Sequence, residues 1–123
     1  MSPVIPHFEL AEEAGDAGAH VIGIRGEIHV TTAPRFAEHL TQAIERGKTA
    51  IVLDMTGVEF IDSTGLSVLL NGLRLLNQRR GHLALVCTNP TVLRLFQITN
   101  LDSTFDIFAD RPQAIAHVTS ATT

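Results

Sequence analysis

The stretch AIVLDMTGVEFIDSTGLSVLL (residues 50–70) contains two apolar runs separated by a short polar junction. Its first part, AIVLD (50–54), is apolar without alternation, a pattern typical of an inner strand that is covered on both faces of a sheet. The leucines after the junction recur at the spacing of a helix. The stretch therefore predicts a buried strand that leads into a long helix from about Ser63 to Arg80, which Gly81 ends.

The flanking segments predict further strands and helices. Strands are expected at PHFEL (6–10), HVIGIRGEI (20–28), HLALVC (82–87) and FDIF (105–108), and helices at TTAPRFAEHLTQAIERG (31–47), NPTVLRLFQITN (89–100) and RPQAIAHV (111–118). The first two strands form a hairpin with an acidic turn, EEAGDAGA (12–19), which is longer than such a hairpin needs. This order predicts an α/β fold, a single domain with a mixed sheet of about five strands and about four helices packed on it.

Composition restricts the class of protein. With 123 residues, 45% of them apolar, the chain is expected to form one domain over 1–123, with flexible termini at 1–5 and 119–123. A net charge of −4 and scattered basic residues argue against nucleic acid as a partner. No signal peptide is visible, and no apolar run reaches the roughly 18–20 residues of a membrane helix, so a cytoplasmic protein with no membrane partner is expected.

The same composition argues against metal and cofactor sites. The single cysteine, Cys87, excludes an internal disulfide and is expected to be a small buried hydrophobic residue. His29 and His39 show no spacing typical of metal ligands. We therefore expect no metal and no cofactor.

The junction residues Asp62, Ser63, Thr64 and Gly65 allow more than one interpretation. Asp62 or Ser63 is expected to cap the following helix, and Thr31 or Thr32 the helix in 31–47, because a side-chain oxygen there accepts a free backbone N–H. Capping alone does not explain several such residues followed by a glycine, which weakens a helix by about 1 kcal/mol relative to alanine. Gly65 leaves the backbone bare, so that another group can approach closely. A capping role alone and an exposed functional hydroxyl both stay open.

A catalytic role for Ser63 is poorly supported. A hydrolase elbow has glycine two residues before its serine, and Ile61 stands there. No histidine lies in a recognisable triad context, and the Gly-Lys-Ser/Thr ending of a phosphate-binding loop is absent from the sequence. The chain is therefore not expected to be an enzyme, and a serine hydrolase is the least favoured alternative.

The helix after the junction is amphipathic. At about 100° per residue, one side carries Leu66, Leu69, Leu73 and Leu76, which must face the sheet. The other side carries Ser63, Ser67, Asn71, Arg74 and Gln78. Leu70 stands at the margin of this polar stripe, either as an incompletely buried core residue or as an apolar contact for a partner.

The chain resembles the STAS domain, in particular the bacterial anti-sigma-factor antagonists, in which Asp-Ser-Ser/Thr-Gly-Leu follows a buried strand and opens a long helix. Asp62–Leu66 match this motif, and the likeness extends over GIRGEIHVTTAPRF (23–36) and LRLFQITNLDSTFDIF (93–108). The resemblance implies that a cognate anti-sigma factor serine kinase phosphorylates Ser63, with Thr64 as a less favoured acceptor. Unmodified antagonist binds the kinase and frees the sigma factor, phosphorylated antagonist is released, and a phosphatase restores it.

The resemblance also implies a partner-binding surface around Ser63. Its expected members are Asp62, Thr64, Gly65, Ser67, Leu70, Asn71, Arg74, His29 and Thr31. His29 stands where the family often has an acidic residue, which suggests the hypothesis that partner binding is pH-sensitive, since histidine titrates at about 6.5. The protein is expected to be a monomer or a weak dimer. An alternative for the same fold is a STAS subunit of a transport or stress-sensing assembly that docks through this helix.

Overall fold

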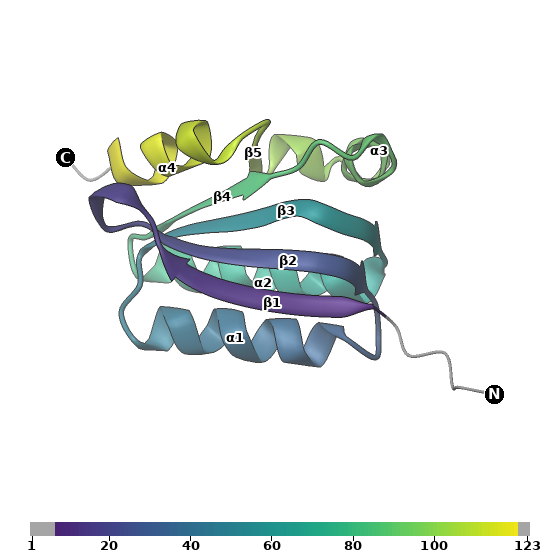
Figure 1. Ribbon diagram of the computed structural model, residues 1–123, viewed down its shortest axis with the longest axis horizontal. Helices are drawn as coiled ribbons and strands as arrows, with labels where there is room; N and C mark the ends of the chain where they lie inside the picture. The colour runs from purple at the N-terminus through teal and green to yellow at the C-terminus, as the bar shows by residue number, and fades with distance from the viewer. Residues whose placement is uncertain (1–6, 121–123) are drawn as a thin grey trace.

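The computed structural model describes residues 7–120 and has a five-stranded sheet with helices on both faces (Figure 1). The strands are β1 (Phe8–Ala14), β2 (His20–Ile28), β3 (Ala50–Ile61), β4 (His82–Val86) and β5 (Asp106–Phe108); the helices are α1 (Ala33–Glu45), α2 (Ser63–Gln78), α3 (Pro90–Ile98) and α4 (Arg111–Ser120). Short 3-10 turns occur at Asp16–Gly18 and Leu101–Ser103. The strands lie in chain order, with β1 antiparallel to β2 and the other neighbours parallel. The predicted α/β fold is confirmed.

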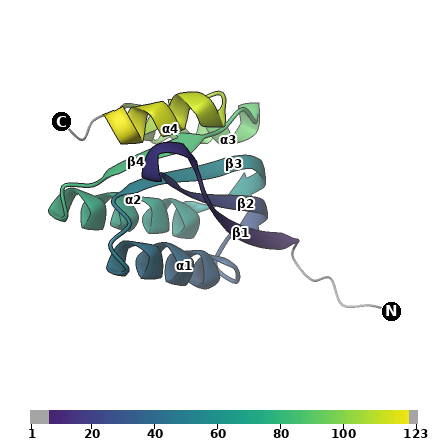
Figure 2. The ribbon, with the colours of Figure 1, turned by 60° about the vertical axis from the view of Figure 1, so that its left-hand side comes forward.

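The helices form two layers around the sheet. α1 and α2 lie side by side on one face and α4 lies on the other, as Figures 1 and 2 show. Crossovers between parallel strands are almost always right-handed, so successive helices in this strand order fall on the same face. The larger apolar cluster joins the sheet to α1, α2 and α3, and includes Ile22, Phe36, Leu53, Leu69 and Phe96. The smaller cluster lies under α4 and includes Val21, Val52, Ala84 and Val118.

The third strand is longer than the predicted segment 50–54, because β3 continues to Ile61. Thr56 and Gly57 have the composition of a turn, but they lie within the strand. A Cβ on Gly57 would lie 2.7 Å from Cγ of Arg25 on β2, so this glycine marks a close approach between strands. Two register shifts in the ladder between β2 and β3 accommodate it.

Both ends of the chain also differ from expectation. β1 reaches Ala14, so the first part of segment 12–19 is strand and the connection itself is not unusually long. At the other end, α4 continues to Ser120, two residues beyond the predicted helix 111–118, and flexibility of Thr119 and Ser120 stays a prediction. The expectation for 1–5 and 121–123 lies outside the described residues.

The start of α1 differs in its hydrogen bonds. Thr32 precedes the helix, but its Oγ1 donates to the carbonyl of Glu27 (2.7 Å) and accepts from the N–H of His29 (3.0 Å). The expectation that Thr31 or Thr32 caps α1 through its side chain is therefore wrong. The Thr32 backbone is already near-helical (φ −99°, ψ −23°), and its hydroxyl turns back to the end of β2.

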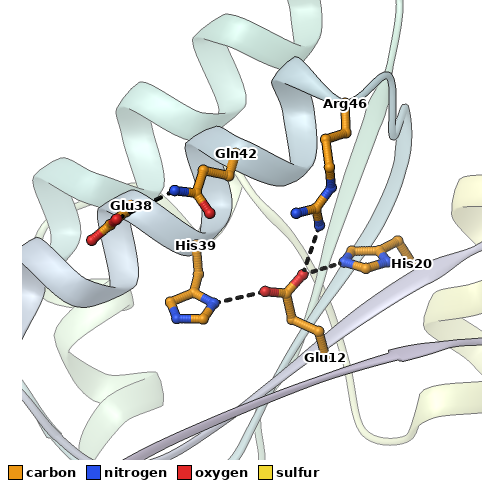
Figure 3. Close-up of polar contacts among 6 residues, drawn as sticks. All are labelled: Glu12, His20, Glu38, His39, Gln42 and Arg46. Carbon is orange, nitrogen blue, oxygen red and sulfur yellow. Dashed lines mark hydrogen bonds and ion pairs between the residues drawn. The ribbon is translucent and has the colours of Figure 1, made fainter.

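Glu12 connects the hairpin to α1 (Figure 3). Its carboxylate lies 2.7 Å from Nε2 of His20, 2.7 Å from Nδ1 of His39 and 3.2 Å from the guanidinium of Arg46. Partial burial raises the pKa of Glu12, but the hydrogen bonds from His39 and His20 and the electrostatic interactions with these rings outweigh burial and lower it from 4.5. These contacts lie where the backbone pairing of β1 with β2 continues to Ala14, opposite His20.

Replacing Glu12 by Gln should lower the free energy of unfolding near pH 6 by about 1 kcal/mol, as expected for a partly exposed ion-pair cluster. Because the pKa of Glu12 is lower in the folded chain, its contribution is present above pH 4.5 and is lost as the pH falls through the lowered value. Urea unfolding of both proteins at several pH values checks this. The difference should shrink below pH 4.5, and Glu45→Gln, at an exposed position of α1, should show little effect at any pH. A difference that stays constant to low pH would contradict this account.

Candidate functional site

The candidate site lies at the carboxyl ends of β2 and β3, where these strands lead toward α1 and α2 (Figure 1). The N–H of Asp62 donates to the carbonyl of Ile28 at 3.1 Å and so ties the two strand ends together. His29 directly follows Ile28, and Ser63 directly follows Asp62. The fold therefore brings two segments far apart in sequence, both singled out by sequence analysis, to one edge of the sheet.

Asp62 is the residue that caps α2. Its carboxylate accepts the N–H of Gly65 at 3.1 Å, and its backbone is extended, as an N-cap requires. Ser63 is then the first residue of the helix, and its side chain is exposed. Within residues 7–120, no hydrogen bond occupies the Ser63 hydroxyl. Helix N-termini favour negative charge, because their first N–H groups are free and the helix dipole is positive there.

The structure corrects the interpretation of Gly65. This residue is buried, and a Cβ at this position would lie 2.6 Å from Cγ1 of Ile61 and 2.8 Å from Cγ2 of Ile28. The groups that approach its bare backbone belong to the chain itself. Gly65 therefore lets α2 begin close to the strand ends, and it is not open to an approaching partner.

The exposed stripe on α2 is as predicted. Ser63, Ser67, Asn71, Arg74 and Gln78 are exposed, whereas Leu66, Leu69 and Leu76 are buried and Leu73 is half-buried. Two local hydrogen bonds order the stripe, from Ser67 Oγ to the Ser63 carbonyl (3.0 Å) and from Arg74 to Asn71 Oδ1 (2.6 Å). Leu70 is 39% exposed beside them, so an apolar side chain adjoins the polar stripe.

A groove of about 230 Å³ separates this stripe from α1. Thr64, Ser67 and Asn71 line it from α2, opposite residues of α1. The absence of a side chain at Gly72 lets the two helices come close, since a Cβ there would lie 2.5 Å from Cδ2 of Leu40. Three of the expected partner-binding residues thus share one concave surface.

His29 and Thr31 lie in the turn after β2. The N–H of Thr31 donates to Nδ1 of His29 at 3.2 Å. His29 is half-buried and Thr31 is exposed. Within residues 7–120, neither side chain is hydrogen-bonded to Ser63. The hypothesis that His29 makes partner binding pH-sensitive stays a prediction.

Three exposed apolar side chains were not singled out from the sequence. Val30, Phe60 and Ile98 are 69%, 47% and 71% exposed. Phe60 and Ile98 stand in apolar runs whose pattern is that of core residues, and only their places near the ends of β3 and α3 leave them uncovered. A sequence signal that separates them from core residues is lacking.

Over residues 7–120, no group of three or more His, Cys, Asp or Glu side chains is placed to hold a metal ion. None of the helices described is long and apolar enough to span a bilayer. Cys87 is buried, as expected, and burial raises the pKa of its thiol.

Comparison with known proteins identifies the family. A sequence profile described as "STAS domain" matches residues 11–114. The chain belongs to the STAS domain family. This STAS domain is 39% identical over 88 residues to the anti-sigma-B factor antagonist of Listeria monocytogenes, an alignment that covers 70% of this chain and 75% of the relative.

Solved structures show the same similarity. An anti-sigma factor antagonist from Mycobacterium paratuberculosis superposes with a TM-score of 0.83 at 28% identity, over 91% of this chain and 94% of that one. The Bacillus cell fate determinant SpoIIAA in its phosphorylated form superposes with a TM-score of 0.70 at 25% identity, over 89% of this chain and 99% of that one.

The cap gives a test of the local structure. Asp62→Ala should lower the free energy of unfolding by about 1 kcal/mol, because the Gly65 N–H loses its acceptor. Asp62→Asn should leave the free energy of unfolding almost unchanged, since asparagine is an equally good N-cap. Urea unfolding followed by circular dichroism measures both. Equal losses in the two variants would show that charge, rather than the hydrogen bond, is what α2 requires.

Proposed function

We propose that this STAS domain is an anti-sigma-factor antagonist that binds a serine kinase acting as an anti-sigma factor and is switched off by phosphorylation on Ser63. The observation that carries the proposal is the exposed hydroxyl of Ser63 on the first residue of α2, which makes no hydrogen bond within residues 7–120. It stands within the segment that matches the family motif, and the relatives described above are named anti-sigma factor antagonists.

The domain is built to tolerate the modification. Phosphoserine carries about −1.5 to −2 charges and three strong acceptor oxygens. At a helix N-terminus such a charge is favoured by about 0.3–1 kcal/mol at the surface. The Asp62 carboxylate repels it, but the phosphoserine oxygens stay in water and the repulsion is weak. Phosphorylation should therefore leave the fold intact.

The cost of phosphorylation falls on the complex. A partner surface fitted to a neutral hydroxyl would have to desolvate a dianion. Each 1.4 kcal/mol of this penalty weakens binding about tenfold, so a penalty of about 4 kcal/mol gives a switch of about a thousandfold. A phosphatase that acts on phospho-Ser63 restores the binding form.

The partner surface that we propose surrounds Ser63. It comprises Asp62 before α2, five residues of α2 and two residues of the turn after β2. The residues of α2 are Thr64, Ser67, Leu70, Asn71 and Arg74, and those of the turn are His29 and Thr31. Gly65 supports this surface from within by packing against the strand ends.

The phosphorylation site is tested with purified components. The protein is incubated with ATP and each candidate anti-sigma kinase of the source organism, and phosphate is located by mass spectrometry. Phosphate is expected on Ser63. Ser63→Ala should bind the kinase without being modified, whereas Ser63→Glu should bind far more weakly with an unchanged circular dichroism spectrum. Ser103→Glu, an exposed serine away from the site, is the matched control.

Two outcomes would overturn this assignment. Phosphorylation of the Ser63→Ala protein by the kinase would place the acceptor elsewhere, with Thr64 the first position to examine. Stable binding to a transporter or a large stress-sensing assembly, unaffected by Ser63→Glu, would favour the alternative role for this fold.

Leu70 tests the partner surface independently of phosphorylation. Leu70→Glu should weaken kinase binding about tenfold or more, since it places a carboxylate in a contact that buries an apolar side chain. Ala116→Glu, at an exposed position of α4 on the opposite face of the sheet, should bind as the unmodified chain does. Titration calorimetry measures both. If Leu70→Glu binds normally, Leu70 is only an incompletely buried core residue.

A further inference from the structure

The end of β3 has an edge that no strand covers. β4 pairs with β3 only as far as Asp54, opposite Val86, while β3 continues to Ile61. Over residues 7–120, the edge of Met55–Ile61 away from β2 therefore has no strand partner. Helix α3 packs against this part of β3 instead (Figure 1), and Asn89 Nδ2 donates to the carbonyl of Val58 at 3.3 Å.

The space between β3 and α3 is only partly filled. A groove of about 280 Å³ remains, with Phe60 and Ile61 on one wall and Val92, Leu95 and Ile98 on the other. Phe60 and Ile98, two of the large exposed apolar side chains, stand in it. The volume is at the lower limit of small-molecule sites, which span about 300–1,000 Å³. Protruding apolar side chains around a shallow groove are instead typical of a protein docking surface.

Arg94 adds a positive charge to the groove, which favours a negatively charged group on a bound segment. It is the charged residue of the lining, and its side chain has no ion pair or hydrogen bond within residues 7–120. Two other arginines are paired with carboxylates, Arg46 with Glu12 and Arg111 with Asp54 and Glu13. A guanidinium next to an apolar surface is well suited to a carboxylate, which it can bind through two N–H groups.

Part of the groove lining is adjacent in sequence to the site around Ser63. Phe60 and Ile61 directly precede Asp62 and Ser63, so a protein seated over the start of α2 lies next to the groove. We infer that the groove between β3 and α3 docks the same anti-sigma factor, by taking a segment of it that presents apolar side chains beside a carboxylate. This inference rests on the proposed function. The groove then supplies affinity, while Ser63 supplies the switch.

Charge introduced into the groove tests the inference. Purified anti-sigma factors of the source organism are titrated calorimetrically with the wild-type chain, Ile98→Glu, Arg94→Glu and Gln97→Glu. Ile98 is 71% exposed, so its replacement should not disturb folding, which circular dichroism checks. Ile98→Glu and Arg94→Glu should each weaken binding at least tenfold. Gln97→Glu adds one negative charge to α3, as Ile98→Glu does, but lies outside the groove lining and should bind like wild type.

The outcomes separate this inference from the proposed function. If Ile98→Glu binds like wild type while Ser63→Glu does not, the groove proposal is wrong and the switch stands. If Ile98→Glu binds weakly while Ser63→Glu binds normally, the groove stands and the switch is wrong. If no anti-sigma factor binds the wild-type chain, both are wrong. Self-association of the chain in sedimentation velocity that Ile98→Glu abolishes would make a second copy the occupant and overturn the proposed partner.

Discussion

The close packing of α2 on the ends of β2 and β3 governs the arrangement of the site. A side chain at Gly65 would lie within 3 Å of both Ile61 and Ile28, so the first turn of the helix can approach the strands only with glycine there. Asp62 holds the same turn through two hydrogen bonds, donating to the Ile28 carbonyl and accepting from the Gly65 N–H. With its neighbours fixed in this way, Ser63 faces solvent at a defined position.

The polar junction thus combines several structural roles in consecutive residues. Asp62 caps the helix, Gly65 packs inside, and Thr64 lines the groove beside α1. Neither the Ser63 nor the Thr64 hydroxyl makes a hydrogen bond within the part of the chain that the structure describes, but Ser63 is exposed whereas Thr64 is half-buried. The cap therefore belongs to Asp62 and the exposed hydroxyl to Ser63, and a function for that hydroxyl stays a prediction. A charge added to Ser63 would leave the interactions that hold the turn unchanged.

The unequal lengths of β3 and β4 shape the surface around this turn. Because β4 ends early, helix α3 rather than another strand lies beside the end of β3. The packing between α3 and β3 is incomplete and leaves a groove. Phe60 and Ile98 stay exposed in the groove between β3 and α3. The carboxyl ends of parallel strands are where α/β proteins commonly bind ligands, since helix N-termini converge there. Here the same edge combines the exposed hydroxyl of Ser63 with an apolar groove.

The sequence by itself determined the elements and the capped turn, because apolar periodicity and N-capping depend on neighbouring residues alone. It predicted the buried strand at 50–54, the polar stripe of α2 and a cap at Asp62 or Ser63. Tertiary structure decided how far β1 extends, through its backbone pairing with β2 as far as Ala14. It also decided the burial of Gly65 and the exposure of the groove side chains. These properties depend on which segments of the chain contact one another in the fold, and a local sequence pattern does not specify those contacts.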